Sequence, residues 1–272
     1  MPIPLKVGFI GVGNMSQAII KGLLESKQIS ASMIYGSNRS QGKLQKVCEQ
    51  YKIHECKDNE ELINSTDVIF LGMKPQDMSA AVDSLASVFS DKQIVISLAA
   101  GVTIKSLAKR LPQCRIARVM PNTPTVLRRG VIGYTLSHED PGLESVVEDL
   151  LSPLGVVFRL EDEEQMAALT VSCASGTGFV FELMTYWQDW IEERGFDPEQ
   201  ARLMVVETFL GAAMLASHNS ETTIEELQNK VTSKKGITAA GLESMRELEL
   251  ERVLRYSFEK AALRNQELAK ES

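Results

Sequence analysis

The sequence predicts an α/β fold in its first half, built on a parallel, doubly wound sheet, followed by an all-α second half. Short apolar runs of strand length alternate with helical patterns up to about residue 160. Strands and helices that alternate in this way indicate βαβ units and a parallel sheet. Beyond residue 161 the patterns are those of long helices rich in Ala, Met and aromatic residues. We therefore expect two domains, residues 1–160 and residues 161–272.

The size and composition of the chain are those of a globular protein. Its 272 residues are enough for two domains of ordinary size. Hydrophobic residues make up 44% and charged residues 24%, which argues against disorder and a coiled coil. The net charge of −7 argues against nucleic-acid binding as the main role. Because no apolar stretch approaches a signal sequence or a membrane span, we expect a soluble, cytoplasmic protein.

The cysteines and histidines show no metal-ligand spacing. No CxxC motif is present, and the histidines are scattered. Free buried thiols, with no metal site, are therefore expected. The residues concerned are Cys48, Cys56, Cys114, Cys173, His54, His138 and His218.

A strand–turn–helix unit opens the chain. Residues 6–10 form an apolar run suited to a buried parallel strand, and a helical pattern begins at Ala18. Between them, Gly11 and Gly13 allow a tight turn, and Ser16 stands at the third position of a GxGxxG-like fingerprint. Such a unit directs free N–H groups and the positive end of a helix dipole at one place, which suits a pyrophosphate. The alternative is a glycine-rich turn that binds nothing.

The remaining elements of the first half follow in order. A second strand is expected at residues 33–35 and a helix at residues 41–51. Further strands are expected at residues 67–72, 93–98, 115–120, 131–136 and 155–160. Because the carboxyl ends of parallel strands meet at one edge of a sheet, the turns after them are expected to line a ligand crevice.

The segment after the second strand indicates which dinucleotide binds. About 20 residues past the glycine turn, a site for NAD presents an acidic residue to the ribose 2′-hydroxyl. Here the chain reads Tyr35 to Ser40 without an Asp or Glu, and offers Ser37, Asn38 and Arg39 instead. The Arg39 guanidinium suits a 2′-phosphate. We therefore expect NADPH, with NADH possible but weaker; an ordinary solvated loop is the alternative.

Three further motifs stand at the ends of later strands. They begin at Met73-Lys74-Pro75, Ala99-Ala100-Gly101 and Met120-Pro121-Asn122. Small residues and prolines there allow close approach of a flat nicotinamide ring, and the Asn122 amide is able to bond its carboxamide. Turns after strands are often built from such residues, so a single motif is weak evidence of a site. The occurrence of three such motifs at successive strand ends is what indicates one.

The second half is predicted to be helical from residue 163 to residue 194, where Gly195 ends the helix. Asp197-Pro198 starts the next helix, which covers residues 199–217. Thr223 and Glu226 form a capping box, and a final helical stretch covers residues 238–270. The apolar residues of these helices exceed what a thin helical pair buries, which favours a dimer interface over an internal core. They include Phe179, Phe181, Met184, Trp187, Trp190, Phe209 and Met214.

The loop from Val231 to Thr238 is the last candidate site. Its hydroxyl groups, its two lysines and the backbone N–H groups of a helix start suit a carboxylate. The alternative is a polar helix–helix loop with a threonine cap.

Five motifs of the chain occur together, namely Gly8–Met15, Lys74–Gln76, Ser97–Val102, Arg118–Pro124 and Val231–Ser233. In combination and in this order, they make the chain resemble pyrroline-5-carboxylate reductase, the last enzyme of proline biosynthesis. The resemblance covers nearly the whole chain.

The resemblance implies an N-terminal Rossmann domain and a C-terminal helical domain that interleaves with a second subunit. Family members are dimers, often assembled into decamers, with substrate at the dimer interface. The substrate carboxylate would meet Ser233, Gly236 and Thr238. Glu164 falls at a position that lines the substrate pocket in some members, and Asn59 at a position near the adenosine.

The pattern and the resemblance together assign the site residues. Substrate binding is assigned to Glu164, Ser233, Gly236 and Thr238, and Thr238 is also the candidate catalytic residue. The cofactor is assigned to Ile10, Gly11, Gly13, Asn14, Met15, Ser37, Asn38, Arg39, Asn59, Met73, Lys74, Pro75, Ala99, Ala100, Gly101 and Asn122.

The chain departs from the family on the substrate side. The carboxylate loop of the family reads Ser-Pro-Gly-Gly-Thr-Thr or Ser-Lys-Gly-Gly-Thr-Thr, whereas this chain has Lys235 in place of one glycine and Ile237 in place of one threonine. Lysine enters positive φ less freely than glycine. The family's Gly-Ser-Gly-Pro-Ala stretch reads Ala174 to Gly178 here.

The expected function is the reduction of 1-pyrroline-5-carboxylate to L-proline by hydride transfer from NADPH. One alternative is a reductase of a related cyclic imine acid. Another is a β-hydroxyacid reductase, disfavoured because residues 163–194 lack the lysine such enzymes use on their long helix. The last is a non-catalytic NADPH-binding paralogue. The choice between a dimer and a higher oligomer stays open.

Overall fold

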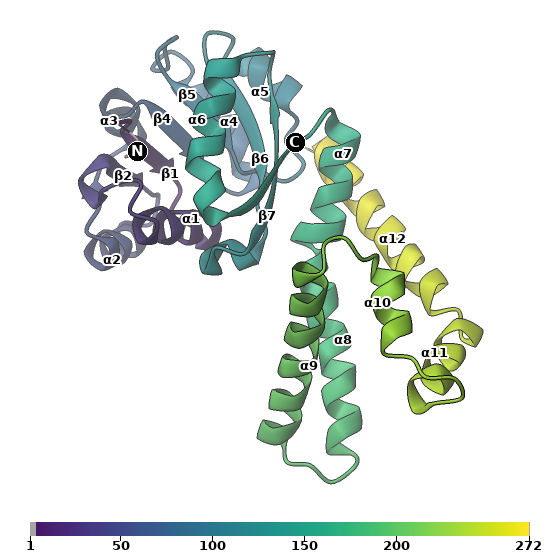
Figure 1. The fold of residues 1–272 in the computed structure, drawn as a ribbon. Helices are drawn as coiled ribbons and strands as arrows, with labels where there is room; N and C mark the ends of the chain where they lie inside the picture. The colour runs from purple at the N-terminus through teal and green to yellow at the C-terminus, as the bar shows by residue number, and fades with distance from the viewer. Residues whose placement is uncertain (1–3, 272) are drawn as a thin grey trace. The chain divides into compact units, whose positions relative to one another are not determined.

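The computed structural model describes residues 4–271 and divides them into two compact units (Figure 1). One unit contains the chain up to Thr177 and again from Ala261, and the other contains Gly178–Lys260. Each unit has its own secondary structure and is described separately.

The first unit is built on an eight-stranded sheet in the order β3-β2-β1-β4-β5-β6-β7-β8. All neighbouring strands are parallel except β6 and β7. The strands are β1 (Val7–Ile10), β2 (Ile34–Ser37), β3 (His54–Glu55), β4 (Val68–Leu71), β5 (Ile94–Ser97), β6 (Arg115–Met120), β7 (Gly130–Leu136) and β8 (Gly155–Arg159).

Helices cover both faces of this sheet, as Figure 1 shows. Phe9 of β1 and Phe70 of β4 face one core and stack with ring centroids 4.8 Å apart. The next residues, Ile10 and Leu71, face the opposite core. On the first face lie α1 (Asn14–Glu25), α2 (Gln41–Tyr51) and α6 (Pro141–Leu151), and on the second α3 (Asn59–Ser65), α4 (Pro75–Leu85) and α5 (Ile104–Arg110). The predicted doubly wound α/β fold is confirmed.

The sheet departs from the predicted parallel arrangement at one position. Strand β7 is antiparallel to β6. The nine-residue link between them, residues 121–129, contains only a 3₁₀ turn, Thr123–Leu127. A parallel return needs a crossover of about a dozen residues or more, so this link permits only an antiparallel neighbour. The two-residue strand β3 also went unpredicted, because it is too short to show a periodicity.

The helical part begins with α7 (Glu163–Leu169), which continues through a π-helical turn, Thr170–Ala174, into α8 (Gly176–Glu192). The N–H of Ser175 donates to the carbonyl of Thr170 at 2.9 Å, a bond across five residues that the predicted regular helix did not include. Met166 and Leu169 pack against Met120 at the end of β6, which joins α7 to the first unit.

The caps read from the sequence are present in the second unit. Gly195 has φ +93°, Asp197 caps α9 (Pro198–His218), and Thr223 and Glu226 form a capping box at α10 (Ile224–Lys230).

The predicted helix at residues 238–270 is two helices, α11 (Ile237–Glu247) and α12 (Leu250–Glu271). They separate at Leu248 and Glu249, where Glu249 adopts φ 52°. No glycine or proline marks this break in the sequence, so the helical pattern runs through it.

One helical stretch, Glu163–Glu192, is long and apolar enough to cross a membrane by length and composition. This corrects the expectation that no stretch approaches a span. The length arises because the π turn joins α7 and α8 without a break. An apolar helix that packs in a protein core passes the same test, so a single such helix is weak evidence of a membrane protein.

Candidate functional site

A cavity of about 360 Å³ lies at the carboxyl ends of β1, β2 and β4. The chain leaves β1 toward β2 on one side and returns to β4 on the other, so this is the switch point where open α/β sheets bind ligands. Eight residues assigned to the cofactor line this cavity, namely Ile10, Gly11, Gly13, Asn38, Arg39, Asn59, Met73 and Lys74.

The glycine turn after β1 closes tightly over the neighbouring strand. Gly11 has φ +92°, and a Cβ there would lie 3.0 Å from the backbone of Gly72. A Cβ at Gly72 would overlap the hydroxyl of Ser16, which donates to the carbonyl of Gly11 at 2.7 Å. The sequence indicates only a strand at Gly72, because the residues that constrain it lie 56 or more positions away in the chain.

The amino end of α1 is open toward a ligand. The N-cap residue of this helix is Gly13, so no side chain covers the first amide groups. A Cβ at Gly13 would meet only the Gly72 carbonyl, at 3.7 Å. Asn14 and Met15 form the first turn; Asn14 is exposed and Met15 half-buried. A helix start with free amide groups beside a close glycine turn fits a pyrophosphate.

The loop after β2 combines polar contacts with positive charge. The Ser37 hydroxyl donates to Asn59 Oδ1 at 2.6 Å, and Asn38 Oδ1 accepts from the N–H of Val12 at 3.3 Å. Arg39 is 88% exposed, and its guanidinium lies 3.4 Å from Asp77. Lys43, on the first turn of α2, also lines the cavity and was missed in the sequence. The two cations suit a phosphate group on the adenosine side.

The other strand-end residues assigned to the cofactor are not among those that line this cavity. Pro75 is the first residue of α4. Ala99 is buried and Ala100 packs against the cluster of Met166 and Leu169. Gly101 has φ +77°, and a Cβ there would meet the backbone of Leu268 and Ala269 at 3.2 and 3.3 Å. The loop that follows β5 is thus enclosed by α7 and the end of α12.

Asn122 is buried and bonds two backbone groups. Its Oδ1 accepts from the N–H of Val131 at 2.9 Å, and its Nδ2 donates to the carbonyl of Cys173 at 3.3 Å. Cys173 lies in the π turn, which exposes a carbonyl for this bond. The predicted contact of Asn122 with a carboxamide stays a prediction.

The substrate residues are distributed over both units. Glu164 is exposed on the first turn of α7, in the first unit. Ser233 and Thr238 are exposed in the second unit, where Gly236 caps α11 and donates its N–H to the Ser233 carbonyl at 3.0 Å. Lys235 adopts φ 55°, a left-handed conformation that glycine adopts more easily. The roles of these residues stay predictions.

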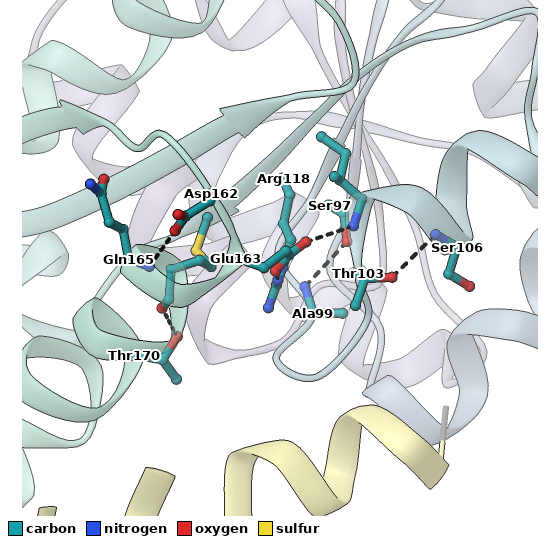
Figure 2. A network of polar contacts seen from close by, with 11 residues as sticks. Ser97, Ala99, Thr103, Ser106, Arg118, Asp162, Glu163, Gln165 and Thr170 are labelled. Carbon is teal, nitrogen blue, oxygen red and sulfur yellow. Dashed lines mark hydrogen bonds and ion pairs between the residues drawn. The ribbon is translucent and has the colours of Figure 1, made fainter.

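An ion pair that the sequence did not reveal lies next to the loop after β5 (Figure 2). Arg118 of β6 is 4% exposed and pairs with Glu163, the first residue of α7. The other carboxylate oxygen of Glu163 accepts from the N–H of Ile104 at 3.0 Å. These residues are 45 and 59 positions apart in the chain, and no local pattern links them.

The thiols are free in the described part of the chain, where Cys48, Cys56 and Cys114 are buried and Cys173 is half-buried. Burial raises the pKa of Cys48, Cys56 and Cys114 to about 11, which keeps them as thiols. Among residues 4–271, no group of three His, Cys, Asp or Glu side chains is arranged to hold a metal ion.

Known proteins match the chain along its length. A family model described as pyrroline-5-carboxylate reductase dimerisation matches residues 163–268, and one described as NADP oxidoreductase, coenzyme F420-dependent, matches residues 6–101. Pyrroline-5-carboxylate reductase from Pseudomonas aeruginosa is 34% identical over 268 residues, which cover 98% of this chain and 97% of the relative. The enzyme from Pasteurella multocida is 33% identical over 267 residues, with coverage of 96% and 97%.

Solved structures agree with these matches. A pyrroline-5-carboxylate reductase from Coxiella burnetii superimposes with a TM-score of 0.89 at 29% identity, over 98% of this chain and 99% of that one. The Plasmodium falciparum pyrroline carboxylate reductase, solved with NADP bound, has a TM-score of 0.88 at 21% identity, over 99% and 100%. The latter likeness is one of fold.

Proposed function

The chain belongs to the pyrroline-5-carboxylate reductase family, and we propose that it reduces 1-pyrroline-5-carboxylate to L-proline with NADPH, in proline biosynthesis. It is an NAD(P)H-dependent oxidoreductase with an N-terminal dinucleotide-binding domain and a C-terminal dimerisation domain. The observation that carries the proposal is the similarity over 98% of the chain, because it spans both the cofactor cavity and the helices of the second half.

The cavity at the end of β1 is the proposed site of the adenosine and pyrophosphate of NADPH. The open first turn of α1 receives the pyrophosphate, since Gly13 leaves its amide groups uncovered. Arg39 and Lys43 bind the 2′-phosphate, and Ser37 and Asn59 lie beside the adenosine ribose. NADH lacks the phosphate that these cations pair with, so it is the weaker cofactor.

The loop at Ser233–Thr238 is the proposed carboxylate site. Gly236 caps α11 without a side-chain bond, which leaves the first amide groups of the helix free for a carboxylate. Lys234 and Lys235 add positive charge, and Thr238 is exposed on the first turn. Thr238 is the proposed donor to the imine nitrogen, directly or through a water.

When held by the cavity residues, NADPH would supply the hydride that reduces the C=N carbon of the imine. A protonated imine is already electrophilic, so the site needs no strong general acid. The chain therefore contributes mainly by positioning: the cavity residues hold the cofactor, and the loop at Ser233 holds the carboxylate.

A second copy of the chain is the expected protein partner. The dimerisation model covers residues 163–268, and large apolar side chains of that region are exposed in the single chain. We propose a homodimer that can assemble further into a decamer, with the substrate at the dimer interface and no membrane partner. Biosynthesis of a soluble amino acid favours a cytoplasmic enzyme.

The functional division is proposed at residue 160, with the cofactor in residues 1–160 and the dimerisation and substrate contacts in residues 161–272. The matches at residues 6–101 and 163–268 support this division. The compact units divide later, at Thr177, because α7 packs on the sheet domain through Met166 and Leu169.

Oxidation of NADPH in the presence of 1-pyrroline-5-carboxylate tests the proposal, with proline as the product to be identified. Thr238→Ala is expected to lower kcat about tenfold or more, because it loses one hydrogen bond to the reacting group, and Thr238→Ser is expected to keep most activity. Ser220→Ala removes an exposed hydroxyl elsewhere in the same unit and serves as the control.

Two outcomes contradict the proposal. Tight NADPH binding without turnover identifies a non-catalytic paralogue. Faster turnover of a six-membered cyclic imine acid identifies a related reductase. This substrate is worth testing because Ile237, next to Thr238 in the chain, is 96% exposed. An unchanged kcat/KM in Thr238→Ala removes the role given to that residue.

A further inference from the structure

We propose that Glu163 is a positioning residue for hydride transfer: it holds the Ala99–Gly101 loop against which the nicotinamide ring is seated. The inference rests on the proposed function, because it concerns the reactive end of the same cofactor site. It goes beyond that function by assigning a role to a carboxylate at the start of α7, next to the exposed Glu164.

The two oxygens of Glu163 make two different contacts, and Figure 2 shows this side chain beside Arg118. Oε2 accepts from the guanidinium of Arg118, at a buried position of β6. Oε1 accepts from the N–H of Ile104 at 3.0 Å, the first residue of α5. One carboxylate thus ties a central strand to the segment that follows the Ala99–Gly101 loop.

Arg118 fixes the position of this carboxylate. The Arg118 side chain is 4% exposed, and its ion-pair partner among the described residues is Glu163. The Nε atom of Arg118 has no hydrogen-bond acceptor among these residues. A buried guanidinium of this kind strongly retains its counter-charge, because separation of the pair leaves an uncompensated charge in the protein interior. Glu163 therefore has little freedom to leave Ile104.

The segment from Ser97 to Ile104 is restrained at several points. Ala99 donates its N–H to the Ser97 hydroxyl at 3.4 Å, and Thr103 accepts from the N–H of Ser106 at 3.2 Å. Ala100 packs against the cluster that contains Met166 of α7. Glu163 supplies a further restraint, at Ile104, and it comes from the same helix as Met166.

The restrained loop lies where the reactive end of the cofactor is expected. The adenosine side of the cavity is formed at the ends of β1, β2 and β4. The Ala99–Gly101 loop follows β5, the next strand beyond β4 in the sheet. A dinucleotide laid across the strand ends from the switch point therefore brings its nicotinamide to this loop.

Three variants of the full-length protein test the proposal. Glu163→Ala removes both contacts. The double variant Arg118→Gln with Glu163→Gln keeps an acceptor for Ile104 and replaces the ion pair with a neutral amide pair. Glu161→Gln removes an exposed carboxylate two residues before Glu163 and serves as the matched control.

We expect Glu163→Ala to lower kcat about ten- to hundredfold, because small displacements of a reacting group cost this much. The dissociation constant for 2′,5′-ADP, a probe of the adenosine half alone, is expected to stay within about twofold of the parent, since that half binds at a different place. Amide hydrogen exchange at residues 99–104 is expected to increase about tenfold, locally. The double variant should recover kcat to within about threefold of the parent.

The proposal would be overturned if Glu163→Ala kept its kcat, or if this variant lost affinity for 2′,5′-ADP by the same factor as it lost kcat. Faster hydrogen exchange across the whole first unit would also overturn it. So would a folded double variant whose kcat is as low as that of Glu163→Ala. If Glu163→Ala does not fold, Glu163→Asp replaces it, since it keeps the charge but shortens the reach to Ile104. Should the parent fail to reduce 1-pyrroline-5-carboxylate, the proposed function fails, while hydrogen exchange and 2′,5′-ADP binding still decide whether Glu163 restrains the loop.

Discussion

Arg39 is a charged side chain with little to hold it in the absence of a ligand. It is 88% exposed, and its ion-pair partner, Asp77, lies 3.4 Å away and is also exposed. Exposed pairs of this kind contribute little, between zero and about 1 kcal/mol. The guanidinium is therefore free to exchange Asp77 for a phosphate, and Lys43 lies at the same cavity to assist it.

Arg39→Ala is expected to raise KM for NADPH about tenfold or more, because a charge-assisted hydrogen bond to phosphate contributes about 1.5–3 kcal/mol. KM for NADH should stay nearly unchanged, since that cofactor has no 2′-phosphate. Initial rates with each cofactor measure both values. Lys46→Ala, which removes an exposed charge of α2 outside the cavity, is the control. Equal effects on the two cofactors would remove the 2′-phosphate role of Arg39.

Among the elements, α6 is held to the sheet by its cap. Asp140 accepts from the N–H of Leu143 at 2.9 Å and from Arg115 of β6 at 2.7 and 2.8 Å. The bidentate Arg115 contact, followed by the Leu143 bond, holds the pKa of the Asp140 carboxyl far below its usual range. One side chain thus starts a helix and fastens it to a strand.

Asp140→Asn is expected to lower the free energy of unfolding by about 1 kcal/mol at neutral pH, because Asn keeps the cap but loses the half-exposed ion pair. The folded pKa is depressed, so the stabilisation is complete above the unfolded pKa and is lost as pH falls through the folded one. The difference between variant and parent should therefore shrink below about pH 4. Denaturant unfolding across pH measures it, with the exposed Asp91→Asn as control. A difference that persists in acid contradicts this account.

At the scale of the whole molecule, the helices of the second unit leave large apolar side chains exposed in a single chain. Helix α9 buries Ala201 and Val205, while Leu203, Leu210 and Met214 are exposed on another side. Their spacing of seven and four residues places these three on one face of the helix. The apolar stretch Glu163–Glu192 is also largely exposed in the single chain, and it lies within the region that matches the dimerisation model.

Leu210→Asp is expected to shift the protein toward the monomer in analytical ultracentrifugation at micromolar concentration, because it places a charge in an apolar interface. Binding of 2′,5′-ADP should survive, since the whole cavity belongs to the first unit. Turnover should fall and depend on protein concentration. Glu207→Gln, an exposed change on the same helix, is the control. An unchanged oligomer with full activity would place the interface elsewhere.

The sequence by itself determined the features whose causes lie within a few residues. The glycine turn at Gly11, the cap at Asp197 and the capping box at Thr223 form as expected, because each depends on backbone conformation or on a bond to a near neighbour. The central strands of the sheet were predictable as well, since burial on both faces leaves a continuous apolar run in the sequence.

Tertiary structure alone decided what depends on distant partners. The direction of β7, the break at Glu249 and the closeness of Gly72 to Ser16 have no local signature. The pairing of Arg118 with Glu163 is likewise absent from any motif, because it joins a strand to a helix 45 residues later. Periodicity records only whether a residue is buried; which charge, strand or backbone atom it meets there is settled when the sheet and its helices pack together.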